Sequence, residues 1–226
     1  YRPFWAKFVP PENQAVDCVP SEWAGKMDAV ISFFALEHVA DPGAFVAEVN
    51  RLLKSGGTFY LLVPNLFANT AELVVADHVN HFSESSLRRL LADGGFAART
   101  VDDSAHQSAW VVAAEKQDGV VGASESVSNE AAVREIAAYW ASFGERVRAF
   151  EQQSEGEAAI YGSGFYGTFI HASLAVPRAV NCFLDQNPHR QKQALLGKPI
   201  LAPEAFPESV QRLYVGLNPR VARDEM

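Results

Sequence analysis

Short apolar runs alternate with helix-periodic segments between about residues 14 and 115, and this alternation constrains the fold more than any other feature of the chain. Buried strands of a parallel sheet are short and continuously apolar, and the crossover helices between them carry apolar residues at helical spacing. The stretches 28–34 and 58–63 fit strands, and the stretch 41–53 fits a helix between them. The pattern therefore predicts an α/β fold.

Capping residues support these boundaries. Asp41 and Pro42 supply an N-cap and a first-turn proline, and Ser55-Gly56-Gly57 ends the helix. Residues 66–82 are irregular, polar and rich in histidine. The other expected elements of this half are a capped helix over 83–91 and an antiparallel edge hairpin over 97–102 and 109–115.

A second, smaller α/β unit is expected after residue 157. Residues 117–128 are small and polar, as in a linker, and apolar residues then keep helical spacing from Val133 to Phe150. We expect that long helix to bridge two domains. Strands are predicted at 157–161, 180–184 and 212–217, with a glycine turn and a helix after the first. The predicted ranges are 1–116, 117–156 for the linker and bridging helix, and 157–226.

Composition argues against several classes of function. The 19 basic and 27 acidic side chains leave no electrostatic footprint for nucleic acid. No stretch reaches the roughly 20 apolar residues of a membrane span, and no secretory signal opens the chain. Cys18 and Cys182 can build neither a disulfide framework nor a zinc knuckle. We expect a cytoplasmic protein whose partner is a small molecule.

The ends of the chain suggest a piece of a longer protein. It begins at Tyr1 without an initiator Met, and it ends at Met226 just after an expected strand and turn. We therefore expect that some functional segments lie outside this sequence.

The segment from Met27 to Asn65 carries the most specific motifs. Leu36-Glu37-His38-Val39 follows the first strand, and Arg51-Leu-Leu-Lys-Ser-Gly-Gly57 ends the helix. This segment closely resembles the fourth strand, the following helix and the fifth strand of class I S-adenosylmethionine-dependent methyltransferases, with Ser55 where the family usually has proline. The resemblance implies a partial Rossmann-like methyltransferase sheet over 1–116, methyltransferase activity and S-adenosylmethionine as cofactor.

Two short segments are the expected cofactor contacts. Open parallel sheets bind ligands at the carboxyl ends of their strands, which places Phe33, Phe34, Glu37 and His38 at the rim of the crevice. Aromatic and acidic groups suit a sulfonium. By the resemblance, Asp17 and the adjacent Cys18 contact the adenine. The alternatives are core packing for the two phenylalanines, helix capping for Glu37 and His38, and a turn aspartate at position 17.

The segment from Asp77 to Ser83 holds the candidate catalytic residues. Methyltransferases that act on small molecules often carry a similar acidic-His-x-x-x-Phe-Ser segment, and in sugar C-methyltransferases its histidine is the proposed base. We expect His78 to act as the base with help from Asp77, and His81 as a second candidate. The alternatives are support of the following helix and a metal site of His78, His81 and Asp77, and we predict no metal.

A glycine loop follows the strand at 157–161. Gly162, Gly164 and Gly167, with Asp185 after the next strand, match the dinucleotide-binding fingerprint. The domain order and the sequence segments that begin at Val180 and Leu196 also resemble the C-terminal Rossmann-like domain of sugar C-methyltransferases, which uses no nicotinamide. These four residues are thus tentative substrate-binding residues for a nucleotide-sugar or another phosphate-bearing molecule. In a circularly permuted arrangement, Asp185 would instead be the ribose acid of the methyltransferase.

The cofactor glycine loop of the family is missing before residue 17, so we expect the chain alone to bind the cofactor poorly or not at all. The favoured function is methyl transfer to a small molecule, possible acceptors including a nucleotide-linked sugar. One alternative is a nicotinamide-dependent or nucleotide-sugar-binding Rossmann protein. The other is a non-catalytic, degenerate methyltransferase module. The sequence does not specify the oligomeric state.

Overall fold

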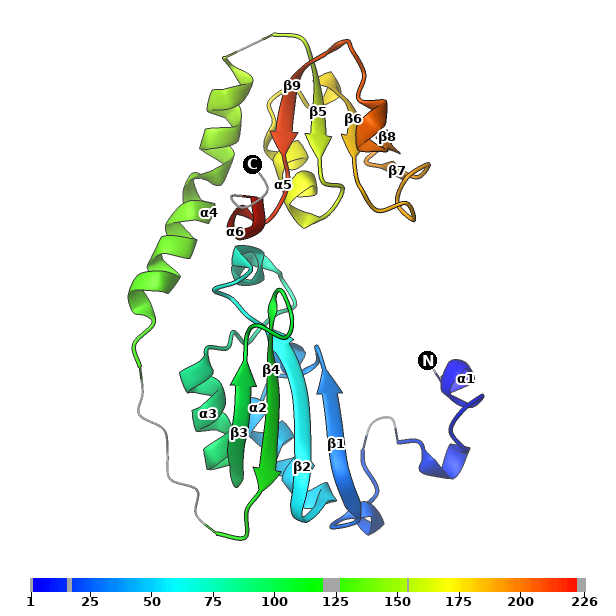
Figure 1. The fold of residues 1–226 in the computed structure, drawn as a ribbon, viewed down its shortest axis with the longest axis vertical. Helices are drawn as coiled ribbons and strands as arrows, with labels where there is room; N and C mark the ends of the chain where they lie inside the picture. The colour runs from blue at the N-terminus through cyan, green and yellow to red at the C-terminus, as the bar shows by residue number, and fades with distance from the viewer. Residues whose placement is uncertain (1, 16–17, 120–126, 154, 223–226) are drawn as a thin grey trace. The chain divides into compact units, whose positions relative to one another are not determined.

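The computed structural model describes residues 2–15, 18–119, 127–153 and 155–222. The described residues form two compact units, and each is considered by itself. The first unit combines residues 1–64 and 82–127, and the second combines 65–81 and 128–226. Figure 1 shows the helices and strands of both units.

The first unit is built on a four-stranded sheet. Its order is β1 (Met27–Phe33), β2 (Leu53–Pro64), β4 (Ala109–Lys116) and β3 (Phe96–Asp102). β1 and β2 are parallel, and β4 is antiparallel to both of its neighbours. The edge hairpin and β1 lie where the sequence predicts them, and the α/β class is confirmed. β2 begins five residues earlier than predicted, at Leu53, so Ser55-Gly56-Gly57 lies within this strand and does not end the helix.

Two helices cover one face of this sheet. α2 (Pro42–Leu52) begins at Asp41, whose side chain accepts a hydrogen bond from the Ala44 amide at 2.9 Å. α3 (Glu84–Asp93) begins at Ser83 with a capping box. The core is formed by alternate strand residues and the apolar stripes of both helices, including Val46, Phe59, Leu61, Leu87, Leu91, Phe96 and Val112.

The remaining elements of the first unit are short. They are α1 (Arg2–Trp5) and three single-turn 3₁₀ helices: η1 (Pro11–Asn13), η2 (Ser21–Trp23) and η3 (Leu36–His38). η3 follows β1 directly and carries the Leu-Glu-His motif. No other secondary structure precedes β1 in the described part of the chain.

The second unit holds a five-stranded sheet in the order β7 (Ala194–Leu195), β8 (Lys198–Leu201), β6 (Val180–Leu184), β5 (Glu157–Tyr161) and β9 (Val210–Val215). β5, β6, β8 and β9 are parallel, and β7 pairs antiparallel with β8. The β7–β8 turn was not predicted. Leu196 and Gly197 form it with φ values of 52° and 74°, the two left-handed positions of a tight hairpin turn.

The helices of the second unit pack on one face of that sheet. α4 (Glu130–Glu151) and α5 (Phe165–Ser173) share an aromatic core around Trp140, which stacks on Tyr166 at a centroid separation of 5.7 Å. α6 (Pro219–Ala222) follows β9, and three single-turn helices complete the unit: η4 (Thr70–Val74), η5 (Pro177–Ala179) and η6 (Pro203–Ala205).

The observed units differ from the predicted ranges at two points. Residues 65–81 group with the second unit, although they follow β2 and precede α3 in the chain. The predicted bridging helix also belongs to the second unit, because its apolar stripe packs against α5 and η4. A contiguous division of the sequence misses the first feature, since residues 65–81 pack against segments far apart from them in the chain.

One negative finding concerns membranes. Within the described ranges, no helix has both the length and the apolar composition that a membrane crossing requires.

Candidate active site

The carboxyl end of β1 presents two exposed aromatic rings. Phe33 is 56% exposed and Phe34 is 43% exposed, and Ile31, two residues before Phe33 on the same face of β1, is 63% exposed. The Phe34 backbone adopts a left-handed φ of 49° while its amide donates to the Leu62 carbonyl at 3.0 Å. A left-handed backbone is costly for a bulky residue and occurs preferentially at functional sites. The two aromatic side chains lie at the carboxyl end of β1, the kind of edge where open parallel sheets bind ligands.

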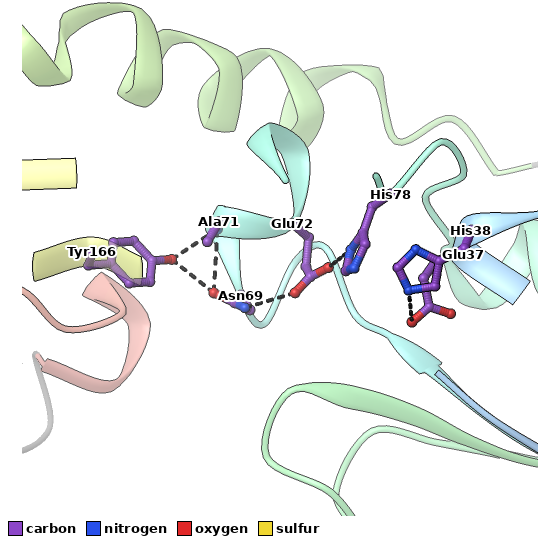
Figure 2. Close-up of polar contacts among 7 residues, drawn as sticks. All are labelled: Glu37, His38, Asn69, Ala71, Glu72, His78 and Tyr166. Carbon is purple, nitrogen blue, oxygen red and sulfur yellow. Dashed lines mark hydrogen bonds and ion pairs between the residues drawn. The ribbon is translucent and has the colours of Figure 1, made fainter. Parts of the chain in front are cut away.

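Glu37 and His38 follow in η3. Glu37 is 1% exposed, and its Oε1 lies 3.9 Å from the Nε2 of His38 (Figure 2). A buried carboxylate needs compensating partners, which makes a role in supporting the turn compatible with this geometry. Cys18, the second proposed adenine contact, is exposed. Asp17 lies outside the residues that the structure describes.

The histidine-rich segment 65–81 is anchored within the second unit. The indole Nε1 of Trp140 donates to the Thr70 carbonyl at 2.7 Å, and the Asn218 amide donates to the Ala68 carbonyl at 2.7 Å. Asn65 begins the segment, and its side chain accepts from the Phe67 amide at 3.0 Å. These bonds hold a stretch with little regular structure at defined positions, as a precisely arranged site requires.

A chain of hydrogen bonds runs from α5 into this segment (Figure 2). The Tyr166 hydroxyl accepts from the Ala71 amide and donates to Asn69 Oδ1, both at 2.9 Å. Asn69 Nδ2 then donates to Glu72 Oε1 at 2.9 Å. Burial raises the pKa of Tyr166, against the lowering effect of its hydrogen bonds from Thr70 and Ala71, so the phenol stays a donor at neutral pH.

The chain ends at His78. Glu72 Oε2 lies 2.5 Å from His78 Nδ1, and only 11% and 15% of the two side chains are exposed. An ionised carboxylate can only accept, so Nδ1 carries the proton of the neutral ring and Nε2 keeps its lone pair. A histidine held in this tautomer by a fixed carboxylate is arranged to accept a proton.

The carboxylate at the His78 ring belongs to Glu72, which the sequence analysis did not single out. Asp77, the residue predicted to assist, is exposed, and its role stays a prediction. Partial desolvation lowers the pKa of His81, and the nearby His78 acts in the same direction while Glu72 opposes it. In the sequence, Glu72 is marked only as an acidic residue six positions before His78. No regular helix spans these residues, so this spacing does not predict that the two side chains meet.

The glycine loop of the second unit has structural reasons for two of its glycines. A Cβ on Gly167 would lie 1.9 Å from the Gly162 carbonyl oxygen. Gly162 has a φ of 96°, and a Cβ there would lie 2.5 Å from the Gly216 carbonyl oxygen. Gly164 is different, because its nearest neighbour would be the Arg190 guanidinium at 3.9 Å. The fingerprint thus serves close packing of α5 on β5 and β9, as well as any ligand contact.

Asp185 is bound to that loop. Its Oδ2 accepts from the amide of Ser163 at 3.0 Å and from the Ser163 hydroxyl, and its Oδ1 accepts from the Asn187 amide at 2.9 Å. Burial opposes ionisation, but these hydrogen bonds and Arg190 prevail and lower the pKa of Asp185. Its carboxylate is therefore engaged within the chain. The assignment of Gly162, Gly164, Gly167 and Asp185 to a substrate stays a prediction.

Comparisons with known proteins match the N-terminal half of the chain to methyltransferases. A family model described as a methyltransferase domain matches residues 5–101. The ubiquinone biosynthesis O-methyltransferase of Xanthomonas oryzae is 33% identical over 104 residues, which are 46% of this chain and 41% of that protein. The Xanthomonas campestris enzyme of the same name is 32% identical over the same shares. The chain spans about two fifths of the length of these curated relatives.

Solved methyltransferases also align with part of the chain. A Mesorhizobium loti S-adenosylmethionine-dependent methyltransferase is 16% identical with a TM-score of 0.36, covering 41% of this chain and 64% of that one. A Burkholderia thailandensis 1,6-didemethyltoxoflavin-N1-methyltransferase is 20% identical with a TM-score of 0.38, covering 52% and 56%. Residues 5–101, which include the β1–α2–β2 segment and its motifs, are thus similar to a methyltransferase domain.

Proposed function

We propose that the protein carrying this chain transfers a methyl group from S-adenosylmethionine to a small molecule, with His78 as the base that deprotonates the acceptor. The observation that carries the catalytic assignment is the 2.5 Å pair of His78 Nδ1 and Glu72 Oε2. The match of residues 5–101 to a methyltransferase domain supports the class of reaction.

The residues after β1 fit one part of a site for the cofactor, which would supply an electrophilic methyl group on a sulfonium. The exposed rings of Phe33 and Phe34 offer an apolar and π-rich surface that suits a positive charge flanked by carbon groups. We assign Glu37 and His38, which follow these rings in η3, to the same contact surface. We assign the adenine contact to Asp17 and Cys18.

In the proposed reaction, His78 accepts a proton at Nε2 as the acceptor atom attacks the methyl carbon. Glu72 stabilises the imidazolium that forms, because its carboxylate accepts the Nδ1–H bond throughout. Asn69 and Tyr166 fix Glu72 in turn, so the base does not need to reorient during the reaction. General base catalysis of this kind contributes about 10²- to 10⁴-fold in rate.

Two classes of acceptor are compatible with this base. The curated relatives are named O-methyltransferases, which favours a hydroxyl acceptor whose O–H proton passes to His78. The resemblance to sugar C-methyltransferases favours a carbon beside a carbonyl in a nucleotide-linked sugar. Both acceptors need the same base, and the residues of the glycine loop are our proposed contacts for the phosphates of the second acceptor.

Calorimetric titration with S-adenosylhomocysteine tests the cofactor assignment on this chain and on the product of the complete open reading frame. Micromolar binding by the complete product supports the proposal. Binding of NADH alone would indicate that the glycine loop is the active centre and would contradict the proposal. Binding of neither compound would favour a non-catalytic module.

Transfer of a labelled methyl group tests the base and the acceptor together. A catechol probes O-methylation, and a nucleotide-linked keto-sugar probes C-methylation. In the complete product, His78→Gln should lower kcat by about 10²- to 10⁴-fold with either acceptor. The matched control is His189→Gln, an exposed histidine of the second unit, which should retain full activity. Full activity in the His78 variant would show that His78 is not the base.

A further inference from the structure

A cavity of about 360 Å³ lies within the second unit, and neither the glycines of the glycine loop nor Glu72 and His78 line it. Two of its lining residues border those features, because Leu217 lies beside Gly162 and Thr70 hydrogen-bonds to Tyr166. Its walls come from α4, from Thr70, from the residues that follow β9 and from α6. Small-molecule sites typically occupy about 300–1,000 Å³. In Figure 1, α6 lies between α4 and the carboxyl end of β9. That end is where an open parallel sheet binds its ligands.

Two arginines from different elements line the cavity. Arg146 projects from α4 and Arg220 from α6, against one carboxylate, that of Glu135. Neither arginine forms an ion pair with another residue that the structure describes. A guanidinium without a carboxylate partner is available for bidentate bonds to an oxyanion. The lining therefore favours an anionic ligand.

Arg134, which also lies on α4, is a surface arginine with a carboxylate partner. It forms an ion pair with Glu130 at 2.7 Å, one helical turn away, and does not line the cavity. Arg146 instead lies over the ring of Tyr139, with its Cζ 5.0 Å from the ring centroid. Stacking on an aromatic face orients the guanidinium without neutralising its charge. Arg146 is also exposed, but its contact with Tyr139 fixes its guanidinium beside the cavity.

The rest of the lining suits an apolar body with one polar end. Ile136 is buried, and Val215 and Leu217 add aliphatic surface beside it. Burial raises the pKa of Tyr139, against the opposing effect of Arg146, so its hydroxyl remains protonated at neutral pH and can donate to an anion. The cavity thus offers two cationic groups and a hydroxyl donor next to an apolar wall.

We propose that this cavity binds a small organic anion, with Arg146 and Arg220 holding its carboxylate or phosphate and the aliphatic wall holding its body. The site requires no methyl transfer and no cofactor. Its failure and the failure of the proposed function are therefore independent.

Calorimetric titration of the 226-residue chain with three aromatic probes tests the site. Phenyl phosphate and benzoate carry the two candidate anions, and benzyl alcohol is their neutral counterpart. At low salt, one or both anions should bind, and benzyl alcohol should bind at least about 10-fold more weakly, the effect of a charge-assisted hydrogen bond of about 1.5 kcal/mol. A preference for phenyl phosphate assigns a phosphate ligand, and a preference for benzoate assigns a carboxylate.

Variants then locate the binding. Arg146→Gln and Arg220→Gln should each weaken the preferred anion about 10-fold or more, with unchanged far-ultraviolet circular dichroism. Arg134→Gln removes the same charge from the same helix outside the cavity and should leave the affinity unchanged. Equal binding of benzyl alcohol, no binding of either anion, or an equal loss in the Arg134 variant would overturn the proposal.

Discussion

Glu72 Oε2 and His78 Nδ1 lie 2.5 Å apart, and this pair orients the imidazole of His78. Because the carboxylate accepts at Nδ1, the neutral ring presents an unprotonated Nε2. The tautomer of His78 therefore depends on the negative charge of Glu72, and a neutral side chain of the same shape does not replace it.

A Glu72→Gln variant tests that dependence. The amide can still accept from Asn69, but its nitrogen then faces His78 Nδ1 as a donor and favours the opposite tautomer. We expect kcat of the complete product to fall by about 10²-fold or more. Methyl-transfer kinetics provide the measurement, with Glu84→Gln, an exposed glutamate paired with Arg88, as the unaffected control. Wild-type kcat in the Glu72 variant would contradict the tautomer argument.

Tyr166 and Tyr214 offer a matched pair of buried phenols in the second unit. The Tyr166 hydroxyl bonds to Thr70, Ala71 and Asn69, each at 2.9 Å. The Tyr214 hydroxyl is buried and has no hydrogen-bond partner among the described residues. Tyr166→Phe should cost about 1–3 kcal/mol, because it removes three buried hydrogen bonds and leaves the Ala71 amide with only its longer bond to Asn69 Oδ1 at 3.4 Å. Tyr214→Phe should be neutral or stabilising.

Urea unfolding and amide hydrogen exchange measure this difference. In the Tyr166 variant, exchange at Ala71 should accelerate together with the fall in unfolding free energy. Equal costs for the two phenols would mean that the bonds from Tyr166 do not hold the segment 65–81.

Alanine variants of Gly167 and Gly164 test whether close packing requires glycine at each position of the glycine loop. Gly167→Ala places a Cβ 1.9 Å from the Gly162 carbonyl oxygen, and relief requires a backbone shift. We expect a loss of about 3 kcal/mol or more in the free energy of unfolding. Gly164→Ala meets nothing closer than 3.9 Å and should change stability by less than about 1 kcal/mol. Thermal or urea denaturation of the two variants decides the point, and a tolerated Gly167→Ala would refute the packing argument.

Local signals explain why most elements were predictable. The side chains of Asp41 and Ser83 cap helices by accepting from backbone amides three residues ahead, and β1 and β2 are apolar runs of adequate length. The exposure of Phe33 and Phe34 was not predictable, since periodicity does not distinguish a core position from the edge of a crevice.

Long-range partners explain what the sequence did not reveal. Glu72 acquires its meaning from Asn69 and Tyr166, and Tyr166 lies 97 positions after Asn69 in the chain. No local pattern marks such a contact, and the same holds for the grouping of residues 65–81 with the second unit. The turn at Leu196 and Gly197 was missed for a different reason, because a leucine at a left-handed position gives no turn signal.

Asp185 makes the stability of the second unit depend on pH. Its folded-state pKa is lowered, so its contribution is fully present above the ordinary aspartate pKa and disappears as the pH falls through the folded-state value. Asp185→Asn should therefore cost about 1–3 kcal/mol at pH 7, where the charged acceptor of the Ser163 bonds is lost, and progressively less below about pH 4. Urea unfolding of both proteins from pH 3 to 8 measures the difference. Glu208→Gln, at an exposed position of the same unit, controls for the loss of one negative charge. A difference that stays constant over this pH range would show that the carboxylate of Asp185 does not stabilise the loop through its charge.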